Sequence, residues 1–117
     1  MRKVGFQVYA ELYGCDKEKI SKLKTVKKIF LDAIRFSELK AIKYQFHQFK
    51  PYGVTALAIL KESHIAFHTW PEFEYASLDI FVCEKKGGLK KANAALKIIK
   101  KATNAKKVSV KKFPRGV

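Results

Sequence analysis

The alternation of apolar and polar side chains along this chain predicts strands. In residues 5–13 every even position is apolar, and every odd position is a glycine, a polar residue or a tyrosine. This period of two is typical of a strand with one buried face. Residues 54–60 are instead almost wholly apolar, which predicts a central strand covered on both faces. Strands are expected at residues 5–13, 39–49, 54–60, 65–69, 75–83 and 107–113, the last as a lysine-rich edge strand.

Two segments have helical periodicity instead. Asp16 is a good N-cap for the first helix, whose apolar residues recur at helical spacing up to about residue 36, with an interruption expected near residues 21–25. The second helix covers residues 89–102 and has an outer face of lysines. The order β-α-β-β-β-β-α-β predicts an α+β fold, a two-layer sandwich of a mainly antiparallel sheet with two helices on one face. The other face, with Tyr9 and Phe49 among its aromatic residues, is left to solvent or a partner.

Length and composition limit the class of protein. A chain of 117 residues with 48% hydrophobic residues fits one folded domain, residues 1–117. No run approaches the ~20 apolar residues of a membrane span, and the N-terminus has no signal-peptide pattern. We therefore expect a cytoplasmic protein without a membrane partner. Its two cysteines, Cys15 and Cys83, are expected to be thiols, Cys15 packed in the interior.

The formal net charge of +15 is the strongest feature of the composition. Clustered lysine and arginine would favour nucleic acid, and a non-catalytic basic module that binds nucleic acid is one hypothesis for this chain. However, the lysines are spread along both predicted helices and the last strand, whereas specific readers of nucleic acid rely on arginine. A solvated lysine surface explains the charge at least as well, and we do not expect a nucleic-acid partner.

Reactive side chains are concentrated in one stretch, residues 61–72, with Cys83 downstream. This stretch contains Glu62, Ser63, His64, His68, Trp70 and Glu72. A histidine that titrates near neutral pH is a suitable proton carrier. In an extended segment His64 and His68 fall on the same face, as zinc ligands would, but no further ligand has suitable spacing. We therefore expect no metal.

The stretch resembles the self-cleavage region of the prokaryotic S-adenosylmethionine decarboxylases, small pyruvoyl-dependent enzymes of polyamine synthesis. Matching blocks stand in the family's order and spacing over nearly the whole chain. They are residues 11–16, 47–55, 62–65, 68–72, 75–76, 79–83 and 115–116.

The resemblance implies that the chain cleaves itself between Glu62 and Ser63. The Ser63 hydroxyl would attack the preceding carbonyl, which converts the amide to an ester. β-Elimination and loss of ammonia would then leave a pyruvoyl group at residue 63, the cofactor, and two chains, 1–62 and 63–117. His68 would accept a proton during processing, and His64 would be a hydrogen-bonded neighbour.

The resemblance also implies roles in decarboxylation of S-adenosylmethionine, which supplies aminopropyl groups for spermidine synthesis. The substrate amine would form a Schiff base with the pyruvoyl carbonyl, and Cys83 would donate a proton to the substrate carbon after carbon dioxide leaves. The implied substrate-binding residues are Phe49, Thr55, Ile65, Trp70 and Glu72. The family forms homodimers with active sites built from two chains, so we expect a dimer of processed protomers.

Some positions depart from the family's pattern. Glu74 stands where the family usually has glycine, and Ser77, Leu78, Val82 and Glu84 also differ. Relatives with the same pyruvoyl chemistry decarboxylate arginine or ornithine, so this substrate class stays open. An inward Glu74 would favour such a substrate's guanidinium or amine, but we expect Glu74 to face solvent.

Overall fold

The computed structural model describes every residue except Met1, Glu62 and Glu84, and it leaves out the side chain of Lys86. None of its helices is long and apolar enough to cross a membrane, as far as the described residues show. The elements in chain order are β1 (Lys3–Tyr13), α1 (Lys17–Ile20), α2 (Leu23–Phe36), β2 (Ala41–Gln48), β3 (Val54–Leu60), β4 (Ser63–Trp70), the 3₁₀ turn η1 (Pro71–Phe73), β5 (Tyr75–Cys83), the 3₁₀ turn η2 (Lys85–Gly87), α3 (Gly88–Thr103) and β6 (Lys107–Gly116).

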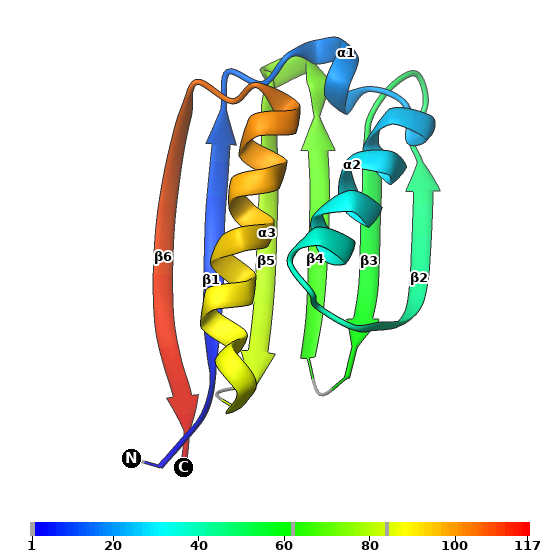
Figure 1. Ribbon diagram of the computed structural model, residues 1–117. Helices are drawn as coiled ribbons and strands as arrows, with labels where there is room; N and C mark the ends of the chain where they lie inside the picture. The colour runs from blue at the N-terminus through cyan, green and yellow to red at the C-terminus, as the bar shows by residue number, and fades with distance from the viewer. Residues whose placement is uncertain (1, 62, 84) are drawn as a thin grey trace.

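The strands form a single 6-stranded sheet in the order β2-β3-β4-β5-β1-β6. All neighbouring strands are antiparallel. The helices α2 and α3 lie side by side on one face of this sheet (Figure 1). The predicted α+β two-layer sandwich is therefore confirmed, with β2 and β6 as the edge strands.

The core lies between the helices and the sheet face that they cover. From Phe6 onward the even-numbered residues of β1, like those of β5 and the odd-numbered residues of β4, point to the helices. Phe30 of α2 and Phe67 of β4 are the largest fully buried side chains. Phe30 also packs edge-on against Tyr44 and Phe46 of β2, which attaches the edge strand to α2. The periodicity of the sequence is thus explained by burial against a single helical layer.

The first helix is interrupted as predicted, between α1 and α2. The side chain of Gln48 stabilises the interruption, because its Oε1 accepts a hydrogen bond from the Leu23 amide at 2.6 Å and its Nε2 donates to the Ser21 carbonyl at 3.0 Å. Asp16 is the N-cap residue of α1, as predicted, but its side chain makes no capping hydrogen bond. Its carboxylate instead accepts hydrogen bonds from Asn104, at the end of α3.

The prediction that β3 is covered on both faces is also wrong for this chain. Leu57 is 41% exposed and Ile59 is 52% exposed, because helices cover only one side of the sheet. Ile42 is 68% exposed, at the point where the register of β2 against β3 shifts, between Ala41 and Lys43.

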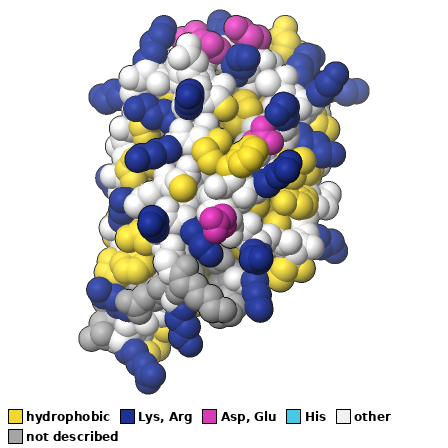
Figure 2. Space-filling view, viewed as in Figure 1, with side chains coloured by type: hydrophobic (Ala, Val, Ile, Leu, Met, Phe, Trp, Pro, Cys, Tyr) yellow, Lys and Arg dark blue, Asp and Glu magenta, His cyan; other side chains and the backbone are white. Residues whose placement is uncertain are grey.

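The uncovered side of the sheet is called the open face below. As predicted, Tyr9, Glu11, Tyr13 and His47 project from it, with Phe49 just beyond β2. It carries a large exposed apolar surface made by Tyr9, Tyr13, Leu57, Ile59, Trp70 and Phe113. The helical side, in contrast, is dotted with lysine and arginine side chains (Figure 2). An apolar surface of this kind is unusual for a solvated face and indicates a partner.

Candidate active site

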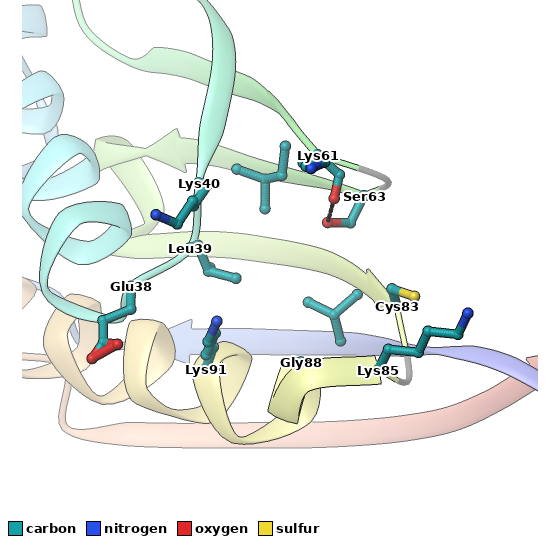
Figure 3. A pocket seen from close by; sticks show the side chains of 11 residues that line it. Glu38, Leu39, Lys40, Lys61, Ser63, Cys83, Lys85, Gly88 and Lys91 are labelled. Atoms are coloured by element: carbon teal, nitrogen blue, oxygen red, sulfur yellow. Dashed lines mark hydrogen bonds between the residues drawn. The ribbon is translucent and has the colours of Figure 1, made fainter.

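Ser63 and Cys83 line the same hollow, at the end of the sheet where β3 turns into β4. Ser63 opens β4, and Cys83 ends the neighbouring antiparallel strand β5, so the two residues come together although they are distant in sequence. The hollow has a volume of about 400 Å³ and is called the Ser63 pocket. Figure 3 shows the Ser63 hydroxyl and the Cys83 thiol at its mouth.

The Ser63 pocket combines apolar side chains with a cationic rim. It is lined by Glu38, Leu39, Lys40, Leu60, Lys61, Ser63, Val82, Cys83, Lys85, Gly88 and Lys91. Gly88 is required by packing, since a Cβ there would lie 2.1 Å from the Cys83 carbonyl oxygen. Among the described lining residues, four lysines stand against one carboxylate, Glu38, so this part of the pocket favours an anionic group.

The hydroxyl of Ser63 donates a long hydrogen bond of 3.4 Å to the Lys61 carbonyl. Glu62, the other half of the predicted cleavage site, lies outside the described residues. Ile65 is fully buried in the core, two residues beyond Ser63 on the helical side of β4, and it lines neither of the two pockets described here.

A second hollow lies at the opposite end of β4 and is called the Trp70 pocket. Its volume is about 380 Å³, and it is lined by Phe49, Lys50, Pro51, Tyr52, Thr55, His68, Thr69, Trp70 and Glu72. Four of the predicted substrate-binding residues and His68 are therefore brought together. Within it, Thr55 Oγ1 lies 3.0 Å from His68 Nδ1, a hydrogen bond whose donor depends on the imidazole tautomer.

The local sequence explains why these side chains meet. Thr55 and His68 stand opposite each other in the β3–β4 register. Thr69 Oγ1 accepts a hydrogen bond from the Val54 amide and donates to the Ile20 carbonyl at 2.7 Å. Gly53, with a φ of 109°, approaches the Thr69 carbonyl closely, so the turn that carries Phe49 is held against the end of β4.

An aromatic stack beside the Trp70 pocket was missed by sequence reasoning. Trp70 stacks on Tyr75, Tyr75 stacks on Tyr13, and the Tyr75 hydroxyl donates a hydrogen bond to Glu11. Burial, and then this bond to Glu11, raise the pKa of Tyr75 above its ordinary value. Alternation alone places Glu11 and Tyr13 on one face, but only the strand register brings Tyr75 to them.

Within one chain, the predicted site residues thus form two groups, which lie at opposite ends of the sheet. Ser63 and His68 are five residues apart on one strand, which separates them by about 17 Å at the usual rise of a strand. His64 shares the open face with His68, as predicted, and stacks on Phe81 with ring centroids 6.0 Å apart. Within a single chain, His68 therefore cannot reach the Ser63 hydroxyl.

Comparison with protein families gives one match, to the family model described as S-adenosylmethionine decarboxylase, over residues 6–116. A protein of Sulfurihydrogenibium named S-adenosylmethionine decarboxylase proenzyme is 39% identical over 116 residues, which is 99% of this chain and 85% of that protein. A protein of Aquifex aeolicus with the same name is 33% identical over 116 residues, 99% of this chain and 84% of the relative.

The fold has a counterpart among solved structures. The crystal structure of the adenosylmethionine decarboxylase from Aquifex aeolicus superimposes with a TM-score of 0.90 at 30% sequence identity, and the match covers 100% of this chain and 94% of that chain. The sheet and the helices are therefore shared essentially in full.

Proposed function

Because this chain belongs to the S-adenosylmethionine decarboxylase family, we propose that it is a proenzyme that cleaves itself between Glu62 and Ser63 and then decarboxylates S-adenosylmethionine. The cleaved protein would consist of chains 1–62 and 63–117 of one domain. The observation that supports this most directly is the division of the site residues between the Ser63 pocket and the Trp70 pocket. Each pocket holds half of the residues that the chemistry requires.

A second copy of the chain supplies the missing half. If two open faces pack together with the sheets running in opposite directions, the end of the sheet that carries Ser63 and Cys83 in each copy meets the Trp70 pocket of the other. The exposed apolar side chains of the open face, such as Leu57 and Ile59, would then be buried between the sheets, which favours association. The functional unit is therefore a homodimer with two shared sites.

Self-cleavage begins at the Ser63 hydroxyl. Its Oγ forms a bond to the Glu62 carbonyl carbon, the C–N bond breaks, and the nitrogen of Ser63 takes up the proton that the hydroxyl loses and becomes an amine. His68 of the second copy, paired with Thr55, accepts and returns protons in this step. Removal of the Ser63 Cα proton then breaks the Cβ–O bond and releases the Glu62 carboxylate. A water molecule supplies the oxygen that takes the place of the nitrogen, which leaves as ammonia.

The residues around Ser63 fit the resulting pyruvoyl group. The hydroxyl lines the hollow opposite Cys83, next to the apolar side chains of Leu60 and Val82. The group supplies a carbonyl that takes up the electron pair left by the departing carboxylate. Cys83 donates the proton that the substrate carbon then needs, and the cationic rim attracts the substrate carboxylate before it leaves.

The Trp70 pocket suits the rest of the substrate. The aromatic faces of Phe49 and Trp70 can stack on adenine and attract a sulfonium cation. Glu72 is exposed at the rim of the pocket, where its carboxylate can accept hydrogen bonds from ribose hydroxyls. Glu74 is also exposed and lines neither pocket, so it does not favour a guanidinium or an amine. These features favour S-adenosylmethionine over arginine and ornithine.

Complementation between two inactive variants tests the shared site. Ser63→Ala and His68→Ala chains, each with a different affinity tag, are expected to stay uncleaved alone. In mixed dimers purified through both tags, one site contains Ser63 and His68, so intact mass should show the His68→Ala chain cleaved and the Ser63→Ala chain whole. The second fragment should be lighter than its sequence predicts by one ammonia.

The wild-type chain is the control for cleavage. Mixed dimers that stay uncleaved while the wild type cleaves would contradict the shared site. The substrate is tested by release of labelled carbon dioxide from S-adenosylmethionine, arginine and ornithine by the cleaved wild type. Release from arginine or ornithine alone would contradict the proposed substrate.

A further inference from the structure

The aromatic stack on the open face holds the chain's single tryptophan. Trp70 keeps 38% of its surface exposed and lines the Trp70 pocket. Its ring stacks on Tyr75 with centroids 5.2 Å apart and an interplanar angle of 27°. Tyr75 stacks in turn on Tyr13 at 5.6 Å and 27°. The three rings therefore continue one another across β4, β5 and β1.

Tyr75 is the member of the stack that is fixed from two directions. Its ring lies between Trp70 and Tyr13, and its hydroxyl is bound to the Glu11 carboxylate. A hydrogen bond to a charged acceptor is stronger than one between neutral groups. Tyr75 is also half-buried, so its ring has little freedom to move.

Trp70 has little other support. It is the last residue of β4, and its other ring contact among the described residues, with His68, is looser, at 6.2 Å and 43°. An exposed side chain that must be ordered when a ligand binds lowers the affinity by the entropy it loses. A neighbour that orders the indole beforehand removes that loss.

We propose that Tyr75, anchored by Glu11, is a positioning residue that holds the Trp70 indole in the orientation that stacks on the substrate. This rests on the proposed function, because the substrate is the ligand that the indole would meet. Loss of Tyr75 would weaken binding of substrate and transition state alike, so KM should rise while kcat changes little. Self-cleavage, which uses Ser63 and His68, should be unaffected.

The test compares Tyr75→Leu and Tyr75→Phe with a matched control, Phe36→Leu. Phe36 is an exposed aromatic residue at the end of α2, on the helical side and away from the open face. Two quantities are measured on the cleaved protein. One is the quenching of Trp70 fluorescence by acrylamide without substrate, and the other is KM and kcat for S-adenosylmethionine.

In Tyr75→Leu, quenching should increase and KM should rise about three- to tenfold, the range expected for loss of one aromatic pair. Tyr75→Phe keeps the stack and loses only the bond to Glu11, so its KM should rise less. Phe36→Leu should leave both quantities near the wild-type values. Unchanged Trp70 quenching in a folded Tyr75→Leu variant would overturn the proposal, as would an equal rise in KM in Phe36→Leu.

Circular dichroism establishes whether each variant folds. If Tyr75→Leu does not fold, Tyr75→Phe and Glu11→Gln decide, since a Trp70 anisotropy equal to the wild type in both would also overturn the proposal. A wild-type protein without activity on S-adenosylmethionine would contradict the proposed function. The fluorescence comparison would still decide whether Tyr75 orders Trp70.

Discussion

The two thiols of this chain lie in different environments. Cys15 is 1% exposed, and its Sγ donates a long hydrogen bond to the Leu12 carbonyl. Burial raises the pKa of this thiol above its ordinary value. Cys83 is half-buried and lines the Ser63 pocket, and neither cysteine is in a disulfide. Because the thiolate is the nucleophile, Cys15 should be the less reactive of the two.

Alkylation of the folded protein by iodoacetamide near pH 8 should therefore label Cys83 first. Intact mass should show one added group, which Cys83→Ser abolishes and Cys15→Ser leaves in place. Since a raised pKa leaves less thiolate at any given pH, Cys15 should react only when the chain unfolds, for example in denaturant. Equal labelling rates of the two thiols in the folded protein would contradict this prediction.

Whether the contacts of a site residue could be predicted from the sequence depended on how close together the contacting residues are in the chain. Ser63 and Cys83 were found from their sequence blocks, and the structure brings them to one pocket. Tyr75 and Glu11 are 64 residues apart in the sequence. Their contact depends on the register of β5 against β1, which no local sequence pattern predicts. The separation of Ser63 from His68 is a local feature, but it became clear only because β4 begins at Ser63, whereas the sequence predicted a strand that begins at residue 65.

In the described part of the chain, three turns place a residue other than glycine in the left-handed region. These residues are Glu38, Glu74 and Asn104, with φ values of 67°, 52° and 57°. Asn104 tolerates this conformation well, whereas a glutamate has its Cβ close to the following carbonyl. Glu74 ends η1 and is exposed, so its side chain does not compensate for this cost through burial. This conformation also explains why glycine would suit position 74.

Glu74→Gly should therefore stabilise the chain by about 1 kcal/mol. For a domain of this size, that corresponds to a rise in Tm of about 3–6 °C. The matched control is Glu18→Gly, which removes the same charge from the exposed single-turn helix α1 and should lower stability by about 0.5–1 kcal/mol. Thermal unfolding followed by circular dichroism measures both, and shifts of the same sign would contradict the explanation.

At the level of elements, the periodicity of apolar residues was sufficient to predict a strand or helix that has one buried face. It predicted all six strands and the interruption before α2. It failed at β3, whose apolar outer residues Leu57 and Ile59 are exposed in a single chain. A wholly apolar strand indicates that both of its faces are buried, but it does not indicate whether this chain or another chain covers them. The wrong prediction at β3 is thus itself an argument for a partner.

The charge of the whole molecule opposes association of two copies. Each chain carries a formal charge of +15, and the described residues contain one ion pair, between Lys28 and Asp32. Most lysines are therefore solvated, as the helical side in Figure 2 illustrates. Their repulsion is screened by salt over about 10 Å at 0.1 M ionic strength. In the proposed homodimer, apolar burial at the open face would then have to provide the attraction between the copies.

Placing charge on the open face should consequently prevent both assembly and cleavage. In the double variant Leu57→Lys, Ile59→Lys, two cations would be buried without partners in the dimer, at a cost of several kcal/mol. Sedimentation should give a monomer, and intact mass should show an uncleaved chain, because His68 lies about 17 Å from Ser63 on its own strand. The control Phe36→Lys adds a cation to the helical side, where Phe36 is 64% exposed, and should dimerise and cleave normally. A folded monomer of the double variant that still cleaves itself would show that one chain contains the whole processing site, and the shared site would have to be abandoned.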